Sequence, residues 1–141
     1  MRYLGLDIGQ TRIGVAVSDA EGRLASPVKV MPAQEVLANA RTWRLLLDDY
    51  QPQCLVCGLP LSLDGQEHDQ ALRIRGQAET IARAAGLPLE FADERLSSAE
   101  AKRILREEGL TEKAMRGKVD MVAASLILQA WLDAHAQGEA Q

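Results

Sequence analysis

The chain has 141 residues, of which 47% are apolar and 26% charged, and this predicts one domain over residues 1–135 with a frayed tail over 136–141. No apolar run approaches the roughly 20 residues of a membrane span, and the chain starts with a strand pattern instead of a signal peptide, so we expect a soluble, cytoplasmic protein. The net charge of −4 argues against a uniformly basic surface but does not exclude a nucleic-acid partner, because carboxylates at a metal site would contribute negative charge.

The first 31 residues predict a meander of three antiparallel strands. Strand-forming residues fill 3–8, 12–18 and 24–30, and the connections are so short that consecutive strands must form hairpins. Apolar residues then recur at helical spacing, which predicts one amphipathic helix over 33–50. Pro52 ends this helix.

The next strand is predicted over residues 53–58, which are uniformly apolar and too few for a surface helix. Cys54 and Cys57 lie in this strand with the spacing C-x-x-C. Strand residues three apart point to opposite faces, so the two thiols cannot chelate one metal or form a disulfide. We therefore expect two buried, structural cysteines.

The second half of the chain predicts helices around one further strand. A helix over about 67–85 precedes a strand over 89–93, and the S-x-x-E spacing from Ser97 to Glu100 predicts a helix that runs to Glu108. The last helix, over 117–134, is apolar on nearly all sides and should be buried. Together these elements predict an α/β fold with a mixed five-stranded sheet, antiparallel in its first three strands and then parallel, with helices on both faces.

Asp7 is the first candidate site residue. It lies on the first strand, on the face opposite Leu6 and Ile8, where its neighbour Gly5 leaves open space. A buried carboxylate must be paired or coordinate a metal, so we interpret Asp7 as functional. The alternative is a structural hydrogen bond to the following turn, a common use of aspartate.

Three further acids are candidates for the same site. Asp120 lies in the first turn of the last helix, on its inward face, whereas a purely electrostatic role at a helix N-terminus would be met by an exposed position. Asp93 and Glu94 end the strand over 89–93. Adjacent strand residues point to opposite faces, so only one of these two can join Asp7, and the sequence leaves open which.

These acids predict a site for Mg²⁺ or Mn²⁺, because hard divalent cations take oxygen ligands and the chain has only two histidines. Two such ions, about 3.5 to 4 Å apart, would support phosphodiester cleavage.

Basic residues accompany the acids in the sequence. Arg95 could neutralise one acid or reach a phosphate, and Arg12 is a secondary contact. Lys113, Arg116 and Lys118 stand in a predicted loop without acids, which could hold a nucleic-acid backbone. The alternative for this loop is an ordinary solvated surface.

Four motifs together resemble the YqgF (RuvX) family of RNase H-like proteins in order and spacing. The matching segments are 5–9 with 12–19, 56–60 with 64–65, 93–97, and 118–120 with 123–124. The resemblance implies an RNase H-like fold and a metal-dependent nuclease, acting on the 5′ end of precursor 16S rRNA or on branched DNA as a Holliday-junction resolvase-like enzyme. It places the metal ligands on Asp7, Glu94 and Asp120. Many RNase H-like relatives carry an acid at the end of the fourth strand, where this chain has Gly58, and whether Asp93 adds a fourth ligand stays open.

Two other interpretations remain. Residues 7–11 also resemble the first phosphate loop of the actin, hexokinase and Hsp70-like ATP-binding fold, but that fold needs two lobes and this chain has room for one. The second interpretation keeps the fold and makes the acids structural, in a non-catalytic nucleic-acid-binding or ribosome-assembly factor. Paired incision of a DNA junction would call for a homodimer, which nothing in the sequence shows.

Overall fold

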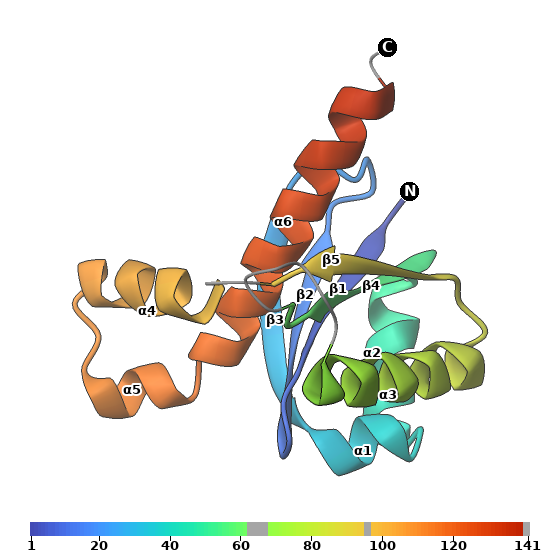
Figure 1. Cartoon of the computed structure of the whole chain (residues 1–141), viewed down its shortest axis with the longest axis horizontal. Helices are drawn as coiled ribbons and strands as arrows, with labels where there is room; N and C mark the ends of the chain where they lie inside the picture. The colour runs from blue at the N-terminus through green and yellow to red at the C-terminus, as the bar shows by residue number, and fades with distance from the viewer. Residues whose placement is uncertain (62–67, 95–96, 140–141) are drawn as a thin grey trace.

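The computed structural model describes residues 1–61, 68–94 and 97–139, and within them five strands form one mixed sheet with helices on both faces (Figure 1). The strands are β1 (Tyr3–Ile8), β2 (Arg12–Ser18), β3 (Ala25–Pro32), β4 (Cys54–Leu59) and β5 (Leu89–Asp93). Their order is β3-β2-β1-β4-β5, in which β1, β2 and β3 pair antiparallel while β4 pairs parallel with β1 and with β5. The predicted fold class is confirmed.

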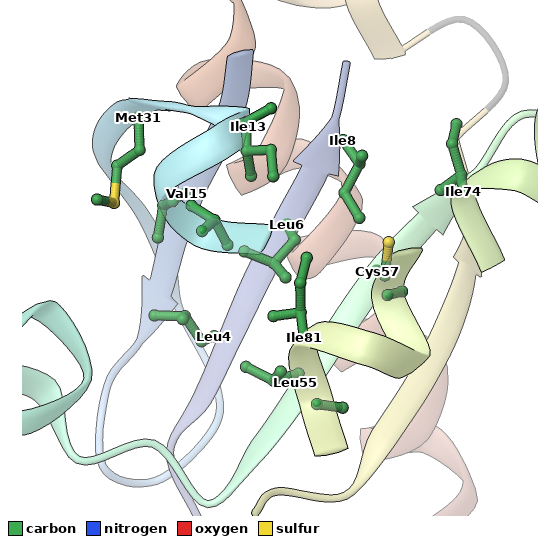
Figure 2. Close-up of a cluster of buried hydrophobic side chains, with 14 of the residues drawn as sticks. Leu4, Leu6, Ile8, Ile13, Val15, Met31, Leu55, Cys57, Ile74 and Ile81 are labelled. Carbon is green, nitrogen blue, oxygen red and sulfur yellow. The ribbon is translucent and has the colours of Figure 1, made fainter. Parts of the chain in front are cut away.

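The described helices are α1 (Ala33–Leu37), α2 (Arg41–Tyr50), α3 (Asp69–Ala85), α4 (Ser97–Glu107), α5 (Glu112–Arg116) and α6 (Val119–Glu139). On one face of the sheet, α1, α2 and α3 cover the larger hydrophobic core (Figure 1). Figure 2 shows this core, where Leu6 and Ile8 of β1 meet Ile74 and Ile81 of α3. On the other face α6 packs on the sheet through Leu128 and its neighbours.

The two cysteines are buried and free, as predicted. Cys57 packs into the larger core, whereas the preceding Val56 packs under α6, as strand alternation requires. Burial raises the pKa of both thiols, that of Cys54 to about 11, so both stay protonated at neutral pH.

The structure corrects the bounds of five predicted elements, of which the strand expected over 53–58 runs instead over Cys54–Leu59. The single helix expected over 33–50 is two helices, because Asn39 adopts a left-handed φ of 53° and Ala40 is extended. The third strand begins later than expected, since Asp19 accepts hydrogen bonds from the main chains of Arg23 and Leu24 and keeps both in the turn. It also ends later, because its pairing with β2 continues to Pro32, which lies opposite Arg12.

The other two corrections concern the C-terminal part. The expected loop over 113–118 is largely helical, because Thr111 caps α5 by accepting a hydrogen bond from Ala114 N. The helix α6 continues to Glu139, so residues 136–139 of the expected frayed tail are helical. No helix in the described ranges combines the length and apolar character that a bilayer crossing requires.

Candidate active site

Asp7 stands at the end of β1 on the face that α6 covers. Strand alternation sends Leu6 and Ile8 into the larger core and turns Gly5 and Asp7 towards α6. A Cβ on Gly5 would lie 2.9 Å from Leu128 Cβ, so this glycine lets α6 approach the strand closely. Asp7 is consequently half-buried between the sheet and the helix.

Glu94 reaches the same place from the end of β5, the edge strand that pairs with β4. Its main-chain N–H donates to the carbonyl of Leu59, 3.1 Å away, which fixes the residue directly after β5. A Cβ on Gly58 would lie 2.8 Å from Glu94 Oε2 and 3.0 Å from Glu94 Cβ. The Glu94 side chain therefore occupies the space over Gly58. As a result, a carboxyl group lies at the end of β4 although β4 itself contains no acid.

The carboxyl groups of Asp7 and Glu94 form a hydrogen bond with each other. Burial, followed by the negative charge of Asp7, raises the pKa of Glu94 to about 8. Burial also raises the pKa of Asp7, and the charge of Asp120 adds to this effect, while the hydrogen bond from Glu94 opposes it. At neutral pH Glu94 is therefore the protonated partner and donates to the Asp7 carboxylate.

Asp120 completes the group from the first turn of α6. The approach depends on Gly14, the β2 residue paired with Asp7, because a Cβ there would overlap the carbonyl oxygen of Asp120. The Asp120 carboxylate forms an ion pair with Arg12, with 3.3 Å between Oδ2 and Nε. Its charge still acts on Asp7, so the three acids share one electrostatic environment.

These residues offer the oxygen donors that a hard cation prefers. Asp7 and Glu94 share a proton in a desolvated position, and a divalent cation could take the place of that proton. Across the parts of the chain that the structure describes, no three acidic, histidine or cysteine side chains already converge on one point as a finished metal site. Asp120 pairs with Arg12 instead.

The structure also places the other predicted site residues. Asp93 is exposed on the strand face of Phe91, which packs against the larger core, so Glu94 and not Asp93 turns to Asp7. Lys113 on α5 and Lys118 before α6 are exposed, and Arg116 is the last residue of α5. The prediction for Arg95 falls outside the described residues.

Gly14 and Gly58 are the site positions that the sequence prediction missed. Glycine inside a strand can mark the close approach of another part of the chain, which was the available signal. That signal does not say which segment approaches.

Comparison with known proteins gives a consistent result at the level of sequence. A family model described as "RuvX: Holliday junction resolvase" matches residues 1–134. A protein of Anaeromyxobacter sp. (strain Fw109-5), named "Putative pre-16S rRNA nuclease", is 45% identical over 133 residues, covering 94% of this chain and 97% of that protein. A protein of the same name from Thermosynechococcus vestitus is 40% identical over 134 residues, covering 95% and 89%.

Solved structures show the same fold at low sequence identity. RuvC of Thermus thermophilus superposes with a TM-score of 0.55 at 18% identity and covers 97% of both chains. The Holliday junction resolvase of fowlpox virus gives a TM-score of 0.54 at 12% identity, covering 95% of this chain and 99% of that one. The RNase H-like architecture expected from the sequence is therefore confirmed.

Proposed function

Since the chain belongs to the RuvX family and is a hydrolytic nuclease, we propose that it processes the 5′ end of precursor 16S rRNA at a site formed by Asp7, Glu94 and Asp120. The observation that carries the assignment of the site is the desolvated carboxyl pair of Asp7 and Glu94 over Gly58. Two desolvated acids that must share a proton do not stabilise the folded protein, whereas a cation site needs their oxygen atoms. The rRNA substrate is taken from the name shared by the relatives at 40–45% identity.

We further propose that Asp7 and Glu94 hold a divalent cation, Mg²⁺ or Mn²⁺, and that Asp120 contributes to a second one. Their donor atoms are all carboxylate oxygens, the ligands that hard divalent cations prefer. Bound cations of this kind lower the pKa of a water molecule and stabilise the leaving oxygen of a phosphodiester. Glu94 would release its proton when the cation binds, so cation affinity should rise with pH.

Basic side chains near these acids would bind the nucleic-acid backbone. Arg12 is more than half exposed, and its ion pair with Asp120 is of the kind worth about 0.2 to 1 kcal/mol. It can therefore exchange Asp120 for a phosphate at little cost. Lys113 and Lys118 are exposed cations close in sequence to Asp120, and we assign Arg95 and Arg116 to the same role from the sequence.

The family model favours a second candidate function, the cleavage of four-way DNA junctions. This alternative would use the same acids, because junction and RNA cleavage are both phosphodiester hydrolysis. It differs in requiring two active sites that cut opposite strands, hence a homodimer.

The test compares the wild-type protein with Asp7→Asn on two substrates, a precursor 16S RNA fragment with its 5′ extension and a four-way DNA junction. We expect Mg²⁺- or Mn²⁺-dependent cleavage of the RNA by the wild type and none by Asp7→Asn. Asp49→Asn is the matched control, an exposed acid on α2 at the opposite face of the sheet. Equal cleavage by Asp7→Asn and wild type would refute the site, and cleavage of the junction alone would replace the RNA proposal.

A further inference from the structure

A hollow of about 400 Å³ lies far along α6 from Asp120. It is bounded by the start of β1, the turn between β2 and β3, and the C-terminal half of α6, which lie beside one another in Figure 1. The side chains that matter here are Tyr3, Arg23, Trp131 and His135, and we call this place the aromatic hollow. Its volume falls in the range of small-ligand sites.

The aromatic hollow holds two of the five Trp, Tyr and Phe rings of the chain, Tyr3 and Trp131, together with the imidazole of His135. The Trp131 ring stacks on His135 with 3.7 Å between centroids and lies 5.0 Å from the tilted ring of Tyr3. Trp43, by contrast, is fully buried in the larger core. Trp131 is only partly covered and His135 is exposed, so these rings present aromatic surface to the hollow.

Arg23 adds a cation at the rim with a well-fixed main chain. Its N–H donates to Asp19 Oδ1 at 2.8 Å, and its carbonyl accepts from Gln129 Nε2 at 2.9 Å. The Arg23 side chain is 78% exposed, and its Nε lies 3.6 Å from a carboxylate oxygen of the exposed Glu21. Such a surface pair is weak, so Arg23 can turn to a phosphate.

The aromatic hollow lies at a distance from Asp7 and Asp120 that one continuous nucleic-acid strand can span. Tyr3 and Asp7 share one face of β1 four residues apart, which is about 13 Å at the usual strand rise. Trp131 follows Asp120 by eleven residues of α6, which is about 16 Å of helix. A strand that is stacked as in a duplex rises about 3.4 Å per nucleotide along its axis, so four or five stacked nucleotides would cover this span.

We propose that the aromatic hollow binds an unpaired base of the nucleic-acid substrate, a few nucleotides from the bond that is cut. The base stacks on the rings of Trp131 and its neighbours, and Arg23 binds the adjoining phosphate. Proteins recognise single strands in this way, with aromatic side chains for the bases and cations for the backbone. The inference rests on the proposed function, since it assigns part of the same substrate to a second place on the surface.

The test measures binding of an end-labelled oligoadenylate by fluorescence anisotropy, with EDTA present so that no cleavage occurs. We expect Trp131→Ala to weaken binding roughly tenfold, as for the loss of one stacked base, and Trp131→Phe to keep most of the affinity. A fully paired RNA duplex should bind equally to all variants, because it offers no unpaired base. Leu45→Ala is the control, an exposed apolar residue beside a similar hollow on the opposite face of the sheet.

Each outcome decides the proposal. If Trp131→Ala keeps the wild-type circular dichroism and binds the oligoadenylate as tightly as wild type, the proposal is wrong. If Trp131→Ala does not fold, the exposed His135→Ala and Arg23→Ala decide, and unchanged binding by both contradicts it. A loss of self-association instead of RNA binding would assign the hollow to a second copy of the chain. If the wild type cleaves RNA but the variants bind the oligoadenylate as tightly as wild type, only the proposal for the aromatic hollow is wrong. If the wild type binds the oligoadenylate through the hollow but cleaves no RNA, only the proposed nuclease function is wrong.

Discussion

Replacing Asp7 by asparagine should stabilise the metal-free protein at neutral pH while it removes cleavage. The reason is the hydrogen-bonded acid pair, in which Glu94 has a pKa of about 8 against an ordinary value of 4.5. Because the folded state binds this proton more tightly than the unfolded state, its contribution to stability is complete below about pH 4.5 and is lost as the pH rises to about 8. The raised pKa of Asp7 acts in the same direction.

The size of this effect follows from the pKa of Glu94. Each pH unit in the window costs about 1.4 kcal/mol, which sets an upper limit of about 3.4 kcal/mol at pH 7. Glu94 is half-buried, and solvent screening reduces this figure to about 2 kcal/mol. Burial remains when Asp7 loses its charge, so Asp7→Asn should recover about 1 kcal/mol, or roughly 3 to 6 °C in Tm.

Thermal unfolding followed by circular dichroism between pH 5 and pH 9 checks this prediction. In EDTA, the wild-type Tm should fall as the pH rises and the Asp7→Asn Tm should fall less. Added Mg²⁺ should raise the Tm of the wild type only, because a ligand stabilises the state that binds it. A wild-type Tm that does not change with pH, together with a less stable Asp7→Asn, would refute the reasoning.

Three further predictions concern single positions. Gly58→Ala should displace the Glu94 carboxylate and abolish cleavage, at a stability cost of about 1 to 3 kcal/mol measured by urea unfolding, and full activity would show that Glu94 does not need this space. Asp93→Asn should keep wild-type cleavage rates in single-turnover assays, because Asp93 is exposed on the other strand face, and a large loss would restore it as a ligand. Arg12→Ala should weaken substrate binding and reduce the slope of log affinity against log salt by about one, and an unchanged slope would mean that Arg12 serves only Asp120.

The sequence predicted the sheet well because alternation is a local property. The bounds of β1 and β2 agree with prediction residue by residue, since their apolar and polar positions alternate and the turns between them are short. The break at Asn39 escaped prediction because the apolar period continues across it, and only the left-handed backbone reveals the interruption. The helix α5 was not predicted, because five residues are too few to show a helical repeat of apolar positions.

The candidate site was predictable as a set of acids but not as an arrangement. Asp7 and Asp120 could be chosen from their own elements, because each is an acid on an inward face. The choice between Asp93 and Glu94 depends on how β5 is placed against β4, which no local pattern contains. The part played by Gly58 could not be predicted either, because its partner Glu94 comes from a different strand end.

Cleavage by Glu94→Gln is the most direct test of the central claim that Asp7 and Glu94 form a catalytic cation site. Glutamine keeps the hydrogen bond to Asp7 but removes the negative charge that a cation needs. Single-turnover cleavage of the precursor 16S RNA fragment should therefore disappear in Glu94→Gln over the whole range of Mg²⁺ and Mn²⁺ concentrations that activates the wild type. Cleavage at the wild-type rate by a folded Glu94→Gln would contradict the account.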